Sequence, residues 1–501
     1  MRKSIIINSK DNVAVALQPL SAGETVEGVV LKENIEQGHK FAIKDITQNE
    51  NVIKYSYPIG HALSNIYAGE WIHTHNIKTN LKDNLQYVYE PESVDISVEN
   101  NNKSDVYDKL KEKTFLGYAR KNGNVGVRNE LWIVPTVGCV NGQSQQIVDK
   151  LKAECDCSGI DDIRAYTHNY GCSQLGEDLD NTRNALAALI KHPNAGGVLV
   201  LGLGCENNQM KDLIATLGEY DKERVCFLVA QEVEDEVETG FEMFKQLLNK
   251  VSKDVRSTQP LSKLTIGLKC GGSDGLSGIT ANPLVGAFSD FLIANGGTTI
   301  LTEVPEMFGA ETILMNRAIN KDVFNKVVSL INDFKDYFRK YDQPIYENPS
   351  PGNKKGGITT LEDKSLGCTQ KGGSAYVVDV LKYTQPVVEH GLNLLNAPGN
   401  DLVAASSLAL SGCQIVLFTT GRGTPFGSFV PTMKIATNSK LFNFKKNWLD
   451  FNAGQIVEDK TMNEVLKQLI DFVIAVADGK KLKHEISNFK ELAIFKSGVT
   501  L

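Results

Sequence analysis

The stretch GGVLVLGLGCENN, residues 196–208, decides the fold class. Its apolar run, which ends in a Gly-rich turn, is typical of a buried strand, and residues 179–192 before it have helical spacing. Further strand patterns occur at 130–139, 162–172, 224–230, 263–272, 298–306 and 413–423, with helical stretches at 144–155, 241–253 and 287–296. Strands that alternate with helices predict an α/β body with mainly parallel sheets covered by helices.

Residues 1–90 have a different pattern, with short β-branched runs separated by Gly, Asn and Asp turns. This pattern predicts a small all-β domain. Residues 91–113 are polar and include a run of three asparagines, which favours a linker, with a solvated loop inside one domain as the alternative. We therefore expect an all-β domain at 1–90, then α/β domains at 114–250 and 260–501.

Composition excludes several classes of function. The formal net charge is -7, whereas the phosphate backbone of nucleic acids favours basic proteins, so we expect no nucleic-acid partner. No window approaches the roughly 18 unbroken apolar residues of a membrane span. The nine cysteines are an odd number and too sparse for a disulfide scaffold. We expect a cytoplasmic protein with free or metal-bound thiols.

Histidines in the first domain form the first candidate site. His73 and His75 are two positions apart in GEWIHTHN, so in a strand they point to the same side. His39 could approach from a neighbouring strand, with Lys40 beside it. Imidazoles on one face suit a divalent transition metal, and the alternative is that they bind substrate hydroxyls or a carboxylate.

Cysteines at predicted strand ends form the second candidate site. Cys139, Cys172, Cys205 and Cys270 each follow an apolar run and sit in a Gly-rich turn. Ligands bind beyond the carboxyl ends of parallel strands, so these thiols can converge on one crevice. Three thiolates can hold iron or an iron–sulfur cluster. The alternative is core packing, since free cysteine behaves as a small hydrophobe.

Polar residues in other turns complete the candidate set. His168 and Glu206 accompany the cysteines, and Ser273 and Asn282 lie in a turn, 270–283, suited to anions. Arg422, between glycines after a strong strand, can hold a carboxylate or satisfy carbonyls at a turn. Lys364 lies in the Gly-rich segment 348–375, which we interpret as an ordered loop over the site rather than a linker.

Six blocks of the main body in one order, together with two stretches of the first domain, resemble the altronate dehydratase and galactarate dehydratase family. The first domain, with EQGHKFAIKDI and GEWIHTHN, looks like the family's SAF-type β-clip domain. FLGYARKNGNVGVRNELWIVPTVGC is similar to the opening of its main body. The resemblance continues through the blocks GEDLDNTRNALAALIKHPNAGGVLVLGLGCE, KCGGSDGLSGITANPLVG, EVPEMFGAE, GNKKGGITTLEDKSLG and LFTTGRGTPFG.

The resemblance implies a hydro-lyase that removes water from a sugar acid, with Fe²⁺ or Mn²⁺, in a homodimer with a Rossmann-like sheet. The length favours the altronate branch, which forms 2-dehydro-3-deoxygluconate in galacturonate catabolism. Galactarate, another sugar acid, a sulfo-lyase reaction and non-catalytic sugar-acid binding are the alternatives. We expect one pocket between the β-clip and the strand ends of the body. The expected metal ligands are His39, His73, His75, Cys139, Cys172 and Cys205. The expected catalytic residues are Lys40, His168 and Glu206, and the expected substrate-binding residues are Ser273, Asn282, Lys364 and Arg422.

Overall fold

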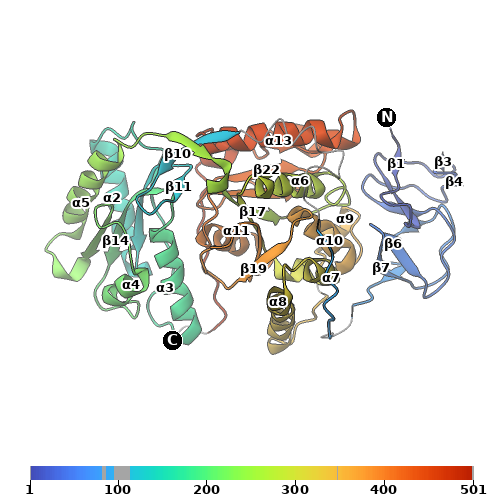
Figure 1. The fold of residues 1–501 in the computed structure, drawn as a ribbon, viewed down its shortest axis with the longest axis horizontal. Helices are drawn as coiled ribbons and strands as arrows, with labels where there is room; N and C mark the ends of the chain where they lie inside the picture. The colour runs from blue at the N-terminus through green and yellow to red at the C-terminus, as the bar shows by residue number, and fades with distance from the viewer. Residues whose placement is uncertain (1, 82–85, 95–112, 347, 499–501) are drawn as a thin grey trace.

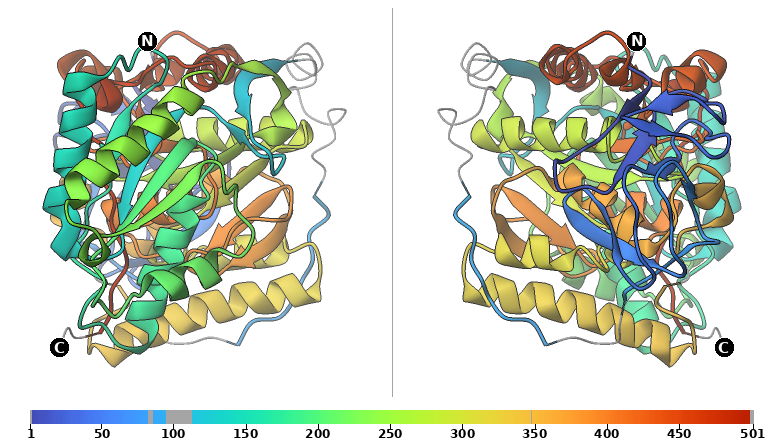
Figure 2. Two further views of the ribbon diagram at one scale, coloured as in Figure 1. Left: turned by 90° about the vertical axis from the view of Figure 1, so that its left-hand side faces the viewer. Right: turned by 90° about the vertical axis from the view of Figure 1, so that its right-hand side faces the viewer.

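The computed structural model describes residues 2–81, 86–94, 113–346 and 348–498. Three sets of sheets lie in a row along the long axis (Figure 1). The N-terminal sheets are at one end, a seven-stranded sheet is in the middle, and a four-stranded parallel sheet is at the other end. Both end-on views agree with this order (Figure 2). The first and second domains are therefore separated by the third.

The N-terminal domain is built from short antiparallel strands. One sheet has the order β1-β2-β5-β8, a second has the order β6-β7-β9, and β3 pairs with β4. Two small apolar clusters fill it, one of which also includes Ala310 and Leu366 of the C-terminal domain. The strands are β1 (Ser4–Ile5), β2 (Val13–Ala16), β3 (Thr25–Val26), β4 (Val29–Val30), β5 (Lys40–Ala42), β6 (Asn51–Lys54), β7 (Tyr57–Ala62), β8 (Trp71–Ile72) and β9 (Ile77–Lys78).

The second domain has a parallel sheet of order β13-β12-β14-β15. Helices α2 and α5 pack together with one apolar cluster, and α3 belongs to another that is shared with the C-terminal domain. Its elements are β10 (Thr114–Ala119), β11 (Val125–Gly126), β12 (Glu130–Pro135), α2 (Asn141–Glu154), β13 (Ile163–Ala165), α3 (Gly176–Ile190), β14 (Ala195–Gly202), α4 (Met210–Leu217), β15 (Val225–Val229), α5 (Glu236–Val251) and β16 (Ser257–Pro260).

The C-terminal domain has a parallel sheet of order β19-β20-β18-β17-β21-β22-β23. Its strands are β17 (Thr265–Cys270), β18 (Thr298–Leu301), β19 (Val377–Leu381), β20 (Leu392–Leu395), β21 (Ile415–Thr420), β22 (Thr432–Ala436) and β23 (Phe451–Asn452). Its helices are α6 (Ala281–Ala294), α7 (Glu311–Asn316), α8 (Lys321–Lys340), α9 (Pro351–Lys355), α10 (Leu361–Cys368), α11 (Asp401–Leu410), α12 (Ser439–Phe444), α13 (Met462–Ala477) and α14 (Lys483–Ile486).

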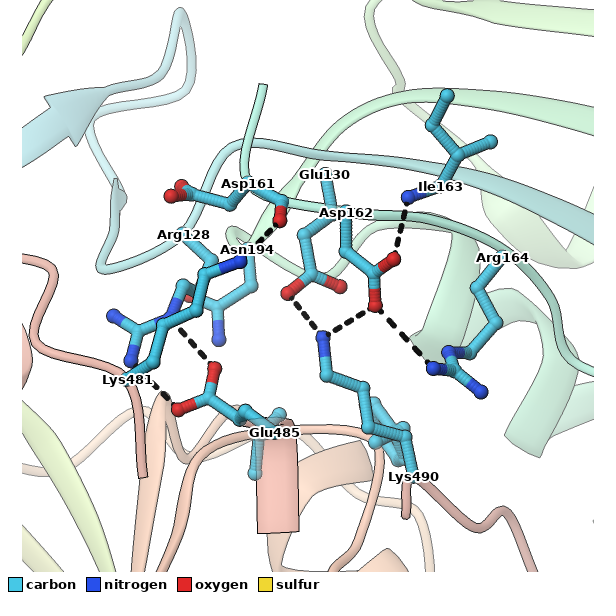
Figure 3. Close-up of polar contacts among 12 residues, drawn as sticks. Arg128, Glu130, Asp161, Asp162, Ile163, Arg164, Asn194, Lys481, Glu485 and Lys490 are labelled. Atoms are coloured by element: carbon cyan, nitrogen blue, oxygen red, sulfur yellow. Dashed lines mark hydrogen bonds and ion pairs between the residues drawn. The ribbon is translucent and has the colours of Figure 1, made fainter. Parts of the chain in front are cut away.

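Buried ion pairs join the last segment of the chain to the second domain (Figure 3). Lys490 Nζ lies 2.7 Å from a Glu130 oxygen and 3.0 Å from one of Asp162. Arg128 and Glu485 make a bidentate pair with N–O distances of 2.8 and 2.9 Å. Burial raises the pKa of Glu130, and the charge of Lys490 opposes that effect. The C-terminal residues therefore anchor the second domain through compensated charges.

The predicted fold class is confirmed: an antiparallel β domain precedes α/β domains with parallel sheets. Segment 348–375 is ordered, as expected, but it contains the short helix α9 and the buried helix α10 rather than a loop alone. Most of the predicted linker, residues 95–112, lies outside the described residues. No helix in the described part of the chain is long and apolar enough to cross a membrane.

Candidate functional site

Two cysteines and a glutamate meet at the carboxyl edge of the central sheet. Cys270 is the last residue of β17, Glu306 follows β18, and Cys368 ends α10. Glu306 Oε2 lies 3.0 Å from Cys270 Sγ and 3.1 Å from Cys368 Sγ, and the two sulfurs are 3.4 Å apart. All three side chains are buried. We call this set the Cys270 cluster.

Lysines surround the Cys270 cluster. Lys371 donates a 3.0 Å hydrogen bond from Nζ to Cys270 Sγ, and Lys364 Nζ lies 2.6 Å from Glu306. Burial opposes ionisation of Glu306, but the charges of Lys364 and Lys371 outweigh it and hold its pKa well below the usual range. Hydrogen bonding to Cys270 and burial raise the pKa of Cys368 well above its ordinary value. Glu306 is therefore ionised, and the Cys368 thiol keeps its proton in the metal-free protein.

The charges around the cluster leave room for a divalent cation. Lys269 Nζ lies 2.6 Å from Glu303 and 2.8 Å from Asp401, so three lysines face three carboxylates: Lys269, Lys364 and Lys371 against Glu303, Glu306 and Asp401. The formal charges of these six side chains balance. A metal ion that displaced both thiol protons would meet two thiolates, whose charge a divalent ion neutralises. The donor set of two sulfurs and one carboxylate suits iron or another transition metal, so the residues fit such an ion.

The N-terminal domain, which we call the β-clip, supplies a second buried group of charges next to this cluster. Lys40 and Lys54 each place Nζ 3.0 Å from one oxygen of Asp363, which lies on α10. One carboxylate cannot neutralise two ammonium groups. Burial lowers the pKa of Lys40 to about 8, against the attraction of Asp363, and the charge of Lys54 lowers it further. Lys54 has its pKa raised by Asp363 despite burial, so Lys40 is the first of the two to lose its proton.

A small cavity connects these two groups. Lys54 and Tyr55 line it from the β-clip, and Ser273, Lys364 and Cys368 are among the residues that line it from the C-terminal domain. The hydroxyl oxygen of Ser273 is buried and has no hydrogen-bond partner in the structure. Buried polar groups are nearly always satisfied, so this hydroxyl indicates a place for a polar ligand or water. A larger cavity lies in the second domain, lined in part by Arg120 and Tyr220, and it contains no member of the Cys270 cluster.

Models of one protein family match almost the whole chain. They are described as the altronate/galactarate dehydratase SAF domain at residues 2–80, the D-galactarate dehydratase/altronate hydrolase second domain at 117–252, and the D-galactarate/altronate dehydratase C-terminal domain at 261–500. This chain belongs to the altronate and galactarate dehydratase family. The recognition made from the six sequence blocks is thereby confirmed.

Curated relatives match this family member from end to end. The chain is 55% identical to the altronate dehydratase of Bacillus subtilis (strain 168), with 100% of each chain covered. It is also 55% identical to the altronate dehydratase of Escherichia coli (strain K12), with 99% of each covered. Its identity to the galactarate dehydratase (L-threo-forming) of Escherichia coli (strain K12) is 33%, with 95% of this chain and 93% of the relative covered.

The β-clip histidines contact other groups, and their ligand atoms are not gathered within 4.8 Å of one another in this structure. His39 donates from Nε2 to the carbonyl of Lys355 and accepts at Nδ1 from Trp71. His73 donates from Nε2 to the carbonyl of Lys354 at 2.8 Å. His75 is exposed and packs against the ring of Trp71. Among the described residues, only the Cys270 cluster brings three possible ligand atoms within 4.8 Å of one another. In this family member, His39 and His73 instead hold the β-clip on α9.

Cys139, Cys172 and Cys205 lie elsewhere, at the far end of the molecule. They follow β12, β13 and β14 of the second domain, and the C-terminal domain separates them from the β-clip (Figure 1). The structure therefore does not combine the β-clip histidines and these thiols into one pocket within a chain. His168 is also in the second domain, where it donates from Nε2 to the carbonyl of Pro135, and burial lowers its pKa.

The predicted substrate residues divide into two groups. Ser273 and Lys364 line the cavity. Asn282 also lines it, but its amide donates to the carbonyl of Gly367 and accepts from Thr419. Arg422 is exposed and lies beside Gly272. Ser273, Lys364 and Arg422 thus remain candidates for substrate contacts, while Asn282 mainly supports α10.

The sequence patterns did not identify Glu303, Glu306 and Cys368, nor Lys54 and Asp363 of the neighbouring charged group. Glu303 and Glu306 follow an apolar strand in TTILTEVPE, so they occupy the same kind of strand-end position as the predicted cysteines. The same rule of strand ends would have found them. Cys368 ends a helix, and the pattern around it carries no comparable signal. Its role is visible only when α10 packs against β17.

Proposed function

We propose that this chain is a metal-dependent hydro-lyase that converts altronate to 2-dehydro-3-deoxygluconate and water. The observation that carries the proposal is the 55% identity, over essentially the full length, to two altronate dehydratases. The identity to a galactarate dehydratase is much lower, at 33%. Galactarate is therefore the second candidate substrate.

We assign the metal to Cys270, Glu306 and Cys368, with Fe²⁺ as the ion and Mn²⁺ as the alternative. The burial of the cluster, its short ligand–ligand distances and its charge balance support this assignment. A bound divalent ion supplies Lewis-acid chemistry toward hydroxyl or carboxylate oxygens. Two adjacent ammonium groups, on Lys364 and Lys371, add positive charge where an enolate-like intermediate needs it.

Proton removal is assigned to the pair of lysines on Asp363. Dehydration requires a base for the proton next to the carboxylate, and a base works best with a pKa near the working pH. Lys40, whose pKa is lowered to about 8, meets that condition. Lys54 and Asp363 of this group line the small cavity beside the Cys270 cluster. Ser273, Lys364 and Arg422 are proposed to contact the substrate carboxylate and hydroxyls, and His168 and Glu206 take no part in this site.

A substrate panel tests the proposal. The protein is purified without oxygen, loaded with Fe²⁺ or Mn²⁺, and given altronate, galactarate and sulfolactate separately. We expect a 2-keto-3-deoxy acid from altronate, with at least about a tenfold lower kcat/KM for galactarate. Sulfite release from sulfolactate without turnover of altronate would overturn the assignment. Binding of altronate without any product would make the chain a sugar-acid-binding protein.

We also propose a homodimer in the cytoplasm. All nine cysteines are free thiols, which fits a reducing compartment. Light scattering of the full chain tests the dimer, and a mass of one chain would contradict it.

A further inference from the structure

The exposed cysteines of this chain all lie in one place. Of the nine cysteines, Cys139, Cys172 and Cys205 are exposed, and the other six are buried or half-buried. Free cysteine is among the most buried residue types in proteins. Three exposed thiols within one domain therefore require an explanation other than packing.

The topology of the second domain brings these thiols to one edge. Its sheet has the order β13-β12-β14, and all pairs are parallel, so the three strands end side by side. Cys172, Cys139 and Cys205 follow these strands in that spatial order. The carboxyl edge of such a sheet is where ligands bind in α/β folds.

Hydrogen bonds join the three turns that carry the thiols. Gly138 donates to the carbonyl of Tyr170 at 2.9 Å, and Asn208 donates to the carbonyl of Gly171 at 2.9 Å. Ser173 donates to the Asn207 side chain at 2.8 Å. The first bond ties the Cys139 turn to the Cys172 turn, and the other two tie the Cys172 turn to the Cys205 turn. The three cysteines are thus presented by one connected framework.

His168 and Glu206 are part of that framework. Both nitrogens of His168 are used within its turn and the neighbouring strand end, at Pro135 and Tyr170. The Glu206 carboxylate accepts hydrogen bonds from Thr136 and from the backbone of Leu203 and Gly204. These buried side chains fix the turns around the thiols, and this explains why polar residues gather beside the cysteines.

Three exposed thiols on one sheet edge suit a cluster better than a single ion. Their sulfurs do not all lie within 4.8 Å of one another, as the ligands of one tetrahedral ion do. Iron–sulfur clusters are bound by cysteine thiolates at the corners of a larger inorganic core. We propose that Cys139, Cys172 and Cys205 bind an iron–sulfur cluster through three thiolates, leaving one iron without a protein ligand. Each thiol releases its proton when it binds.

This site is separate from the Cys270 cluster and goes beyond the proposed dehydratase function. The test measures iron, acid-labile sulfide and visible absorption of the full chain after anaerobic purification and reconstitution with ferrous iron and sulfide. We expect about four sulfides per chain, as in a [4Fe–4S] centre. Changing Cys139, Cys172 or Cys205 to Ser should lower bound sulfide and the visible band by more than about tenfold.

Two controls separate this site from others. Cys157→Ser changes a half-buried thiol of the same domain and should retain the sulfide. Cys270→Ser should retain the sulfide even if it loses dehydratase activity, so failure of the proposed function does not imitate failure of this proposal. Circular dichroism confirms that each variant is folded. A reconstituted wild-type protein without acid-labile sulfide, or sulfide retained when all three cysteines are replaced, would overturn the proposal.

Discussion

The sulfur atoms of Cys270 and Cys368 lie 3.4 Å apart although 98 positions separate the two residues in the chain. One ends a strand of the central sheet, and the other ends the helix that carries Asp363, the partner of the β-clip lysines. The contact therefore links the proposed metal-binding group to the proposed proton acceptor through α10. Disturbing either sulfur should affect both the metal and catalysis.

Replacing Cys270 or Cys368 with Ser should remove the metal and the activity. A hydroxyl is a poorer ligand than a thiolate for iron. Replacing a residue that only supports a metal ligand already lowers metal affinity or activity about 10–100-fold, so loss of a ligand should lower kcat/KM at least about 100-fold. Metal analysis and keto-acid formation check this result. Cys226→Ser, at a half-buried thiol of the second domain, is the control and should retain both properties. Full metal content in the Cys368→Ser variant would exclude it as a ligand.

Mild oxidation of the metal-free protein should join Cys270 to Cys368. Their sulfurs need to approach from 3.4 Å to about 2.05 Å to form a disulfide, and a bound metal would hold them apart. Mass spectrometry after treatment with a thiol oxidant should find this crosslink in the metal-free protein and much less of it after metal loading. Equal crosslinking in both forms would argue that the ion binds elsewhere.

The pH dependence of turnover should report the pair of lysines on Asp363. If the neutral form of Lys40 accepts the proton, as proposed, kcat/KM should rise with pH and reach half its maximum near pH 8. Lys54→Met removes a charge that adds to the lowering of the Lys40 pKa by burial, and it leaves Asp363 to Lys40 alone. The half-maximum should then move to higher pH, toward the range of an ordinary lysine.

Lys40→Met should lower kcat by about 10²–10⁴-fold, the usual contribution of a general base. Lys44→Met removes an exposed lysine two residues beyond β5 and should leave the profile unchanged. An unchanged pH profile in the Lys54→Met variant would refute the coupling between the two lysines.

The sequence patterns were sufficient for the class of fold and its order of domains. The run at 196–208 becomes the central strand β14 and its Gly-rich turn, because a buried parallel strand needs an unbroken apolar stretch. The position of Cys270 at a strand end was also predictable. Lys40 is predicted as a base from the sequence, but its burial, which is the main cause of its lowered pKa, and its neighbour Lys54 across Asp363 depend on how the domains dock.

The arrangement of the site could not be predicted because it depends on how the domains dock. The β-clip histidines have the spacing of metal ligands, and in the structure α9 supplies carbonyl partners for two of them at Lys354 and Lys355. Those contacts span about 300 positions in the chain, and no local pattern encodes them. The expectation of one pocket, shared with Cys205 and its neighbours, did not anticipate that the C-terminal domain lies between the two sets (Figure 1).

Lys490→Met should destabilise the junction of the second domain. It leaves Glu130 buried without its counter-charge, which typically costs about 3–5 kcal/mol. The midpoint of thermal unfolding and the hydrogen-exchange rates of β12 and β13 measure this loss of stability. Lys481→Met, which removes an exposed lysine that contacts only a backbone carbonyl, should stay within about 0.5 kcal/mol of the wild type. Adding Glu130→Gln should recover part of the loss, and no recovery would contradict the ion-pair explanation.

Gly275→Ala should separate the β-clip from the active site. A Cβ atom at Gly275 would lie 1.8 Å from the carbonyl oxygen of Gly38, a backbone atom that cannot rotate away. Gly38 precedes His39 and Lys40, whose contacts with α9 and Asp363 depend on this docking. We therefore expect at least about a tenfold loss of turnover, together with faster hydrogen exchange in β5 and α9.

Gly142→Ala adds a methyl group in open space on α2 and should leave turnover and exchange unchanged. Normal turnover in the Gly275→Ala variant, together with faster exchange at β5, would show that the reaction does not need the β-clip lysines. The general base would then have to come from the C-terminal domain alone.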